Sequence, residues 1–471
     1  MPFVQRLVTK VRRMSMLLPP STEAGATGGT TLNRVCSVFV KLTVVSVLVI
    51  IVGATECSSG RGIRIGTTGG TTTSTAGATS ATGGSAGITV GTTSTTGGTT
   101  GTIGNTGGGG TTSSGGITSY AGMTGTTVQG AFLRTGNVTV ARFAHTATLL
   151  PNGKVLIAGG VGVSRSLASA ELYDPALGTF TATGSMTVAR AFHTATLLLS
   201  GKVLIAGGDS SSGDGGGNGG APIAIAGAEI YDPAAGTFAA TGNMTVARFG
   251  HTATLLLSGK VLIAGGSGSY AMPLYSDSAE IFDAAVGIFT ATGRMSPAQD
   301  ADSATLLSNG MVLISGSGVA QLYDSAAGAF TATANMVVLN FNEYTATLLS
   351  SGMVLIAGGS GGIGDLASAE LYDPTAEIFT ATGSMTQARD SHTATLLPSG
   401  RVLIAGGENN VVALASAKLY DASTGTFTAT SSMTVARVFT TATLLPNGKV
   451  LIVGGTSDGT TALGSAELYE E

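Results

Sequence analysis

All four histidines of this chain occupy one position of a recurring segment, in which Thr-Ala-Thr follows the imidazole. Histidine is the commonest metal ligand and a frequent general base near neutral pH. One His per copy distributes the imidazoles over separate structural units, too far apart for the ~2 Å ligand distances of a zinc site. We therefore expect a structural role, with no metal site and no catalytic residue, for His145, His193, His251 and His392.

Arginine and glutamate recur in the same copies. The arginines, three residues before the His position, are Arg142, Arg190, Arg248, Arg389 and Arg437. The glutamates, in a later strand, are Glu171, Glu229, Glu280, Glu370 and Glu467. A charge inside a packed repeat requires a partner, so we expect Arg–Glu bridges such as Arg190–Glu229. Three copies depart from the pattern: the fourth has Gln299 and Gln321, the fifth has Glu370 without an Arg, and the sixth combines Arg389 with Lys418.

Acidic residues replace the usual segment before the His position in two consecutive copies. This segment contains Asp300 and Asp302 in the fourth copy, and Glu343 and Tyr344 in the fifth. If the two copies are neighbours in space, these residues form an acidic cluster that attracts a basic or cationic partner. We take the four residues as the candidate ligand-binding site. Sequence drift in two degenerate copies is the alternative.

Motifs and charge exclude several functions. Neither H-E-x-x-H nor a Walker pattern occurs. The first 57 residues hold six Lys or Arg and two Glu, so the remainder carries 16 basic and 24 acidic residues and a net charge of −8. An acidic chain without basic runs is unsuited to nucleic acids. We expect no nucleic-acid partner, no cofactor and no enzyme activity.

The elements that position these residues repeat about every fifty residues, and a turn glycine marks each copy: Gly153, Gly201, Gly259, Gly310, Gly352, Gly400 and Gly448. A Thr- and Leu-rich segment precedes the turn, and a fully apolar run follows it, which is typical of paired strands with a buried second strand. A Gly-Gly pair ends that run, as at Gly207 and Gly208. Two more strands follow, with an aromatic pair seven residues apart, such as Tyr231 and Phe238. We expect structural roles for these residues.

This order of features resembles the kelch motif: an apolar strand that ends in Gly-Gly, then Tyr-Asp, then an aromatic residue seven positions after the Tyr. The last position is Phe here, whereas kelch repeats usually have Trp. The resemblance covers about residues 130–471 and implies an all-β fold, a seven-bladed β-propeller of four-stranded blades. The seventh copy ends after its third strand, at Tyr469, whereas Gly130–Gly136 matches a fourth strand. We therefore expect this N-terminal strand to complete the last blade, which closes the ring and removes open sheet edges.

The resemblance also raises an enzyme alternative. Galactose oxidase and similar copper radical enzymes have a seven-bladed kelch propeller, and they use a crosslinked Cys–Tyr cofactor. Residues 129–471 contain no Cys, and we take this as a further argument against an enzyme.

The first 128 residues differ in composition from the repeats. Residues 1–57 are basic and contain the uncharged stretch Leu42–Val52, which is typical of a signal peptide. Cys57 is a candidate lipidation site, and an uncleaved membrane tether within residues 35–57 is the alternative. Residues 58–128 consist mostly of Gly, Thr, Ser and Ala, which predicts a disordered linker. The predicted domains are thus 1–57, 58–128 and the propeller, 129–471.

Nearly identical repeats place any specificity where the copies differ. The loops after the Gly-Gly pair and the segments before the His position vary, and in propellers these share one face. We expect an exported, monomeric binding module of the bacterial type that recognises a protein or glycan at the cell surface. A structural surface-coat protein and an enzyme with an unrecognised site are the alternatives.

Overall fold

The structure is a computed structural model. It describes residues 41–45, 48–52, 130–163, 165–210, 223–268, 276–298, 302–338, 342–361 and 364–471. Outside the propeller, β1 (Lys41–Val45) and β2 (Leu48–Val52) form an antiparallel pair. The described segments include no helix that is long and apolar enough to cross a membrane. Cys57, Asp300 and the predicted linker lie outside the described residues, so lipidation, export and the domain boundaries stay predictions.

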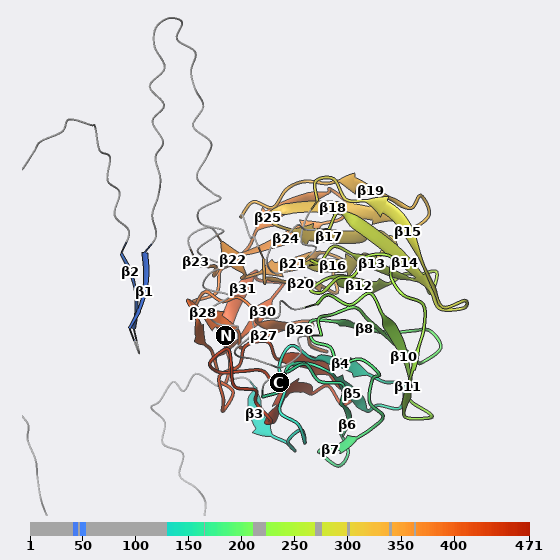
Figure 1. Ribbon diagram of the computed structural model, residues 1–471. Helices are drawn as coiled ribbons and strands as arrows, with labels where there is room; N and C mark the ends of the chain where they lie inside the picture. Colours follow the sequence, from blue (N-terminus) through green and yellow to red (C-terminus); the bar gives the residue numbers. More distant parts are fainter. Residues whose placement is uncertain are drawn as a thin grey trace, which may run out of the picture. The chain divides into compact units, whose positions relative to one another are not determined.

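Twenty-eight of the remaining strands form seven four-stranded antiparallel sheets, as the sequence predicted (Figure 1). Blade 1 contains β4 (Thr146–Leu149), β5 (Val155–Ala158), β6 (Ala170–Asp174) and β7 (Thr179–Ala182). Blade 2 contains β8 (Thr194–Leu197), β9 (Val203–Ala206), β10 (Ala228–Asp232) and β11 (Thr237–Ala240). Blade 3 contains β12 (Thr252–Leu255), β13 (Val261–Ala264), β14 (Ser278–Asp283) and β15 (Ile288–Arg294). Blade 4 contains β16 (Ser303–Leu306), β17 (Val312–Gly316), β18 (Val319–Asp324) and β19 (Ala329–Ala332).

The last three blades follow the same order. Blade 5 contains β20 (Thr345–Leu348), β21 (Val354–Ala357), β24 (Ala369–Asp373) and β25 (Ile378–Ala381). Blade 6 contains β26 (Thr393–Leu396), β27 (Val402–Ala405), β30 (Ala417–Asp421) and β31 (Thr426–Ala429). Blade 7 contains β32 (Thr441–Leu444), β33 (Val450–Val453), β34 (Ala466–Glu470) and β3 (Ala131–Arg134). Two short hairpins lie in the loops of blades 5 and 6: β22 (Ser360–Gly361) with β23 (Gly364–Asp365), and β28 (Glu408–Asn409) with β29 (Val412–Ala413).

Blade 7 confirms the predicted closure of the ring. The N-terminal strand β3 pairs with the C-terminal strand β34, with Phe132 opposite Tyr469 and their ring centroids 4.9 Å apart. Figure 1 shows β3, in teal, beside the red C-terminal strands. The first strands of the blades contact one another in the cyclic order β4, β8, β12, β16, β20, β26, β32 and back to β4. The first strand of each blade therefore belongs to the inner ring.

The hydrophobic core lies between neighbouring blades. The second strand of every blade is buried throughout because both of its faces pack, which explains its uninterrupted apolar sequence. One of seven such clusters joins Leu204 and Met244 of blade 2 to Ile263 and Phe289 of blade 3. Each interface thus needs both of its blades, and this favours a complete ring.

Candidate functional site

The variable loops of the propeller share one face, which we call the loop face. The segment that enters each blade pairs with the first residue of that blade's loop between strands two and three, as in Phe143 with Val161 and Val438 with Thr456. Six described blades show this bridge. In blade 5 this bridge joins Asn342 to Ser360, so the loop is held against the segment that carries Glu343 and Tyr344.

A ring of backbone hydrogen bonds marks the loop-face end of the inner strands. Its members are the residues directly before the His position, and we call them the mouth ring: Ala144, Phe192, Gly250, Glu343, Ser391 and Phe439. Phe192 N donates to Ala144 O at 3.2 Å, and Ser391 N donates to Glu343 O at 2.9 Å in the next blade. All six have a positive φ, between 50° and 62°. Such a conformation is uncommon for residues other than glycine, so the surrounding blades must hold it in place.

The side chains of the mouth ring divide it into two regions. Phe192 and Phe439 meet edge to face with centroids 6.1 Å apart, and Phe439 also lies 6.3 Å from Phe143. This aromatic group belongs to blades 7, 1 and 2. Glu343 belongs to blade 5, whose inner strand β20 contacts β16 of blade 4. The backbone of the ring is uniform, whereas its side chains change from aromatic to acidic.

The candidate acids have distinct surroundings. Asp302 and Glu343 are half-buried and come from adjacent blades, so the structure agrees with the expected neighbourhood. Tyr344 is buried, and its hydroxyl donates to Ser315 Oγ of blade 4 at 2.8 Å. Its side chain thus fills the place that His takes in other blades. A binding role for these three residues stays a prediction, as it does for Asp300, which the structure does not describe.

The histidines connect neighbouring blades through a partner that the sequence analysis missed. His193 Nε2 lies 3.0 Å from Thr146 Oγ1, the first residue of the inner strand in the preceding blade. His145, His251 and His392 make the same contact. Burial, and next the charge of Arg142, lowers the pKa of His145 to about 3. The imidazoles are therefore neutral and engaged in holding adjacent blades together. The Thr directly after each His was the available signal.

The expected Arg–Glu bridges are present in four blades. Arg190 Nη2 lies 2.8 Å from Glu229 Oε1, and both side chains are almost completely buried. Glu229 also accepts from Thr187 N, and Arg190 Nη1 donates to Gly207 O and Gly227 O. The other bridges are Arg142–Glu171, Arg248–Glu280 and Arg437–Glu467.

The remaining residues singled out in blade 2 form its contacts with neighbouring blades. Gly207 has a φ of +62°, and a Cβ there would lie 2.5 Å from Arg248 O of blade 3. Gly208 N donates to the same carbonyl at 2.9 Å. Tyr231 pairs with Phe238 at 4.7 Å, and its hydroxyl bonds to Thr183 Oγ1 of blade 1 at 2.9 Å. Each contact depends on one small or aromatic side chain, which explains why these residues recur.

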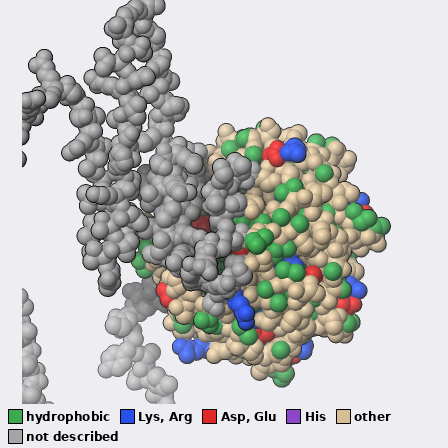
Figure 2. Space-filling model, in the orientation of Figure 1, with side chains coloured by type: hydrophobic (Ala, Val, Ile, Leu, Met, Phe, Trp, Pro, Cys, Tyr) green, Lys and Arg blue, Asp and Glu red, His purple; other side chains and the backbone are tan. Residues whose placement is uncertain are grey.

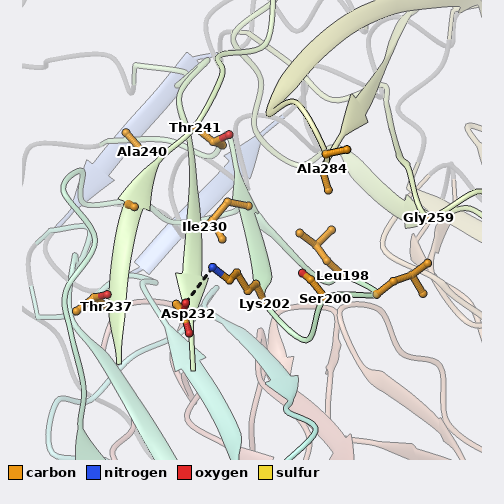
Figure 3. A pocket seen from close by; sticks show the side chains of 13 residues that line it. Leu198, Ser200, Lys202, Ile230, Asp232, Thr237, Ala240, Thr241, Gly259 and Ala284 are labelled. Carbon is orange, nitrogen blue, oxygen red and sulfur yellow. Dashed lines mark ion pairs between the residues drawn. The ribbon is translucent and has the colours of Figure 1, made fainter. Parts of the chain in front are cut away.

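A shallow groove of about 540 Å³ lies on the opposite face, between blades 2 and 3 (Figure 3). Its charged groups are Lys202 and Asp232, which pair at 2.9 Å. Leu199, 77% exposed, forms part of its wall. On the face drawn in Figure 2, charged side chains are scattered among uncharged ones. The two charged groups of the groove are therefore paired with each other.

Comparisons with known proteins identify the fold but no family. No protein-family model and no curated protein matches the chain. Among solved structures, the chain is similar to a fungal alcohol oxidase of the AA5 family in complex with copper. The TM-score is 0.57 at 18% sequence identity, over 72% of this chain and 76% of the oxidase. At this identity the likeness establishes the propeller fold alone.

This likeness contradicts the prediction that the protein is not an enzyme. That prediction rested on missing motifs and on the lack of Cys in the propeller. A propeller of this form carries an alcohol oxidase, so the prediction was wrong to treat those absences as excluding catalysis. The copper of the oxidase is a separate matter. Within the described ranges no three His, Cys, Asp or Glu side chains are grouped to hold a metal ion, and the histidines bond to threonines. The described residues do not fit a copper centre.

Proposed function

We propose that the protein is an exported, kelch-type propeller that binds a basic protein partner through the loop face of blades 4 and 5. The observation that carries the proposal is the mouth ring, whose six described members share one backbone conformation while their side chains differ. Its one carboxylate, Glu343, stands in blade 5 beside the blade that carries Asp302. A constant scaffold with variation on one face is a common way for a fold to acquire specificity.

Charge supports a basic partner. The chain after residue 57 has a net charge of −8, and its acids in most blades are engaged in bridges or turns. Asp302 at the His position and Glu343 directly before it stand at places where the other copies carry no acid. Carboxylates on a binding face speed the approach of a positively charged protein and suppress acidic competitors.

Affinity capture tests this proposal. The full chain is immobilised and exposed to cell-surface proteins and to glycans, in parallel with Asp302→Ala/Glu343→Ala. Glu377→Ala is the matched control because Glu377 is an exposed acid in blade 5, in the turn between β24 and β25. We expect a partner that the wild type and the control retain and the double variant loses. Retention by all three proteins contradicts the proposal, and absence of any partner favours a structural coat protein.

A second candidate function is catalysis on the same face, favoured by the likeness to the alcohol oxidase. Alcohol-dependent oxygen consumption by the full chain, with and without added copper, tests it. Turnover that Asp302→Ala/Glu343→Ala abolishes assigns catalysis to the loop face. No turnover under either condition removes alcohol oxidation as a candidate.

A further inference from the structure

Four blades bind a buried guanidinium group between oxygen atoms. Blades 1, 3 and 7 supply the same four oxygens, whereas blade 2 has Gly227 at the serine position and lacks the hydroxyl. In blade 1, Arg142 Nη1 donates to Gly159 O at 2.8 Å and to Ser169 O at 3.0 Å. Arg142 Nη2 donates to Ser169 Oγ at 3.2 Å and to Glu171 Oε1 at 2.9 Å. Four oxygen atoms thus surround one side of a planar cation, the arrangement that arginine suits better than lysine.

Blade 5 has the same four oxygen atoms but not the arginine. Glu370 pairs with Ile356 in the sheet as Glu171 pairs with Ile157 in blade 1. Gly358 N donates to Ser368 O, as Gly159 N does to Ser169 O. We call Gly358 O, Ser368 O, Ser368 Oγ and Glu370 Oε1 the blade 5 cradle.

The blade 5 cradle contains a carboxylate without a cation. Glu370 is fully buried and accepts from Val337 N and Val338 N, but no Lys or Arg in the described part of the chain forms an ion pair with it. Burial raises the pKa of Glu370. Ser368 Oγ is also buried and has no hydrogen-bond partner among the described residues. The serine and glutamate positions that bind the guanidinium in blade 1 therefore contact no guanidinium in the described part of blade 5.

The sequence of the entering segment offers no replacement from this blade. Blade 5 has seven residues between Met336 and Tyr344, whereas blade 1 has six between Val138 and His145. None of those seven is Lys or Arg. A cation in the blade 5 cradle must therefore come from elsewhere.

The other irregular blades show that the carboxylate is not required by the fold. Blade 4 has Gln321 at this position, and its amide accepts from Ser296 N at 2.9 Å and donates to Pro297 O at 3.0 Å. Blade 6 keeps Arg389 on Gly406 O and Ser416 O without a glutamate. A neutral side chain thus satisfies the backbone, whereas an unpaired buried carboxylate is costly.

We infer that the blade 5 cradle binds a guanidinium group supplied from outside the blade, namely an arginine side chain of the basic partner. Its oxygen atoms correspond one to one with those that hold Arg142. In blade 1 the guanidinium reaches the cradle from the entering segment, which lies on the loop face. The source of the arginine rests on the proposed function, whereas the guanidinium site rests on the cradle alone.

Thermal unfolding of the full chain with methylguanidinium chloride tests the site, with tetramethylammonium chloride as the ionic control. A ligand at ten times its Kd is expected to raise the Tm of the wild type by about 2 °C. Glu370→Gln and Ser368→Ala should lose this rise, each measured against the Tm of the same variant without ligand. Arg142→Ala is the positive control because it opens a cradle of identical residue types in blade 1.

The outcomes separate this inference from the proposed function. Equal responses of wild type, Glu370→Gln and Ser368→Ala overturn it, as does a rise with K⁺ or Ca²⁺ but none with methylguanidinium. If Arg142→Ala does not fold, the comparison of the two blade 5 variants with the wild type still decides. Partner capture that survives Glu370→Gln refutes the arginine source but leaves the proposed function intact. If capture is lost only in Asp302→Ala/Glu343→Ala and the methylguanidinium response is unchanged, the arginine source is likewise refuted and the proposed function stands.

Discussion

Replacing Glu229 by Gln tests how much a single buried bridge contributes to the propeller. The carboxylate accepts from Thr187 N at 2.8 Å and pairs with Arg190 Nη2 at 2.8 Å, and both side chains are at most 2% exposed. A glutamine keeps one acceptor oxygen, but its amide NH₂ group must face either Thr187 N or Arg190 Nη2, which are both donors. Removing one partner of a buried pair costs about 3–5 kcal/mol because it leaves an unpaired buried charge.

The magnitude converts directly into a melting temperature. A propeller of roughly 340 residues has an unfolding entropy near 0.7 kcal/mol/K, so this loss lowers the Tm by about 4–7 °C. Differential scanning calorimetry of the full chain measures it. Lys202→Met is the control, because the Lys202–Asp232 pair is nearly as short, at 2.9 Å, but is solvent-exposed, so water screens the attraction and its loss should change the Tm little. A Glu229→Gln Tm within about 1 °C of the wild type would refute the reasoning.

Three further predictions use the same assay. Gly207→Ala should lower the Tm by several degrees because its Cβ would meet Arg248 O at 2.5 Å, whereas Gly250→Ala, with a φ of +60° and no atom within 4 Å, should cost about 1 kcal/mol or less; equal losses contradict this account. Burial lowers the pKa of His251 to about 3, so its stabilising effect is complete above pH 6.5 and is lost toward pH 3, at about 1.4 kcal/mol per pH unit. His251→Gln should make the Tm less dependent on pH between 7 and 5, and an unchanged dependence refutes it. Phe132→Ala should destabilise the closing strand by about 3 kcal/mol, and an unaltered Tm would show that closure contributes little.

The sequence was sufficient for the fold because the repeat encodes it many times. The apolar run Val203–Ala206 and the aromatic pair Tyr231 and Phe238 have counterparts of the same geometry in every blade. The Gly-Gly pair after the run recurs in every blade but the fourth, which has Ser315 and Gly316. The strand at Ala131–Arg134 was predictable for the same reason, since it repeats the fourth strand of the other copies.

Contacts between blades were less accessible to sequence reasoning. The bond from His193 to Thr146 joins two copies, and its existence depends on the distance between inner strands, which a repeat alone does not specify. Tyr344 was placed in the binding site because the fifth copy departs from the usual segment there, yet its hydroxyl donates to Ser315 of blade 4 and its ring is buried. The missing cation of Glu370 was visible in the sequence, but the unpartnered Ser368 beside it required coordinates.

The enzyme prediction failed for a different reason. Missing motifs and a missing Cys describe particular chemistries, whereas the fold accommodates others, as its likeness to an alcohol oxidase shows. The residues of a site determine its chemistry, so the loop face needs functional measurements.

Binding of a labelled hexa-arginine peptide, followed by fluorescence anisotropy, tests most directly whether the loop face of blades 4 and 5 recognises basic ligands. The full chain is compared with Asp302→Ala/Glu343→Ala and with Glu377→Ala, at low and high salt. We predict binding that weakens about tenfold in the double variant, or roughly 1.4 kcal/mol, and not in Glu377→Ala. Equal affinities for all three proteins, or no binding by the wild type at low salt, would contradict the proposed role of Asp302 and Glu343.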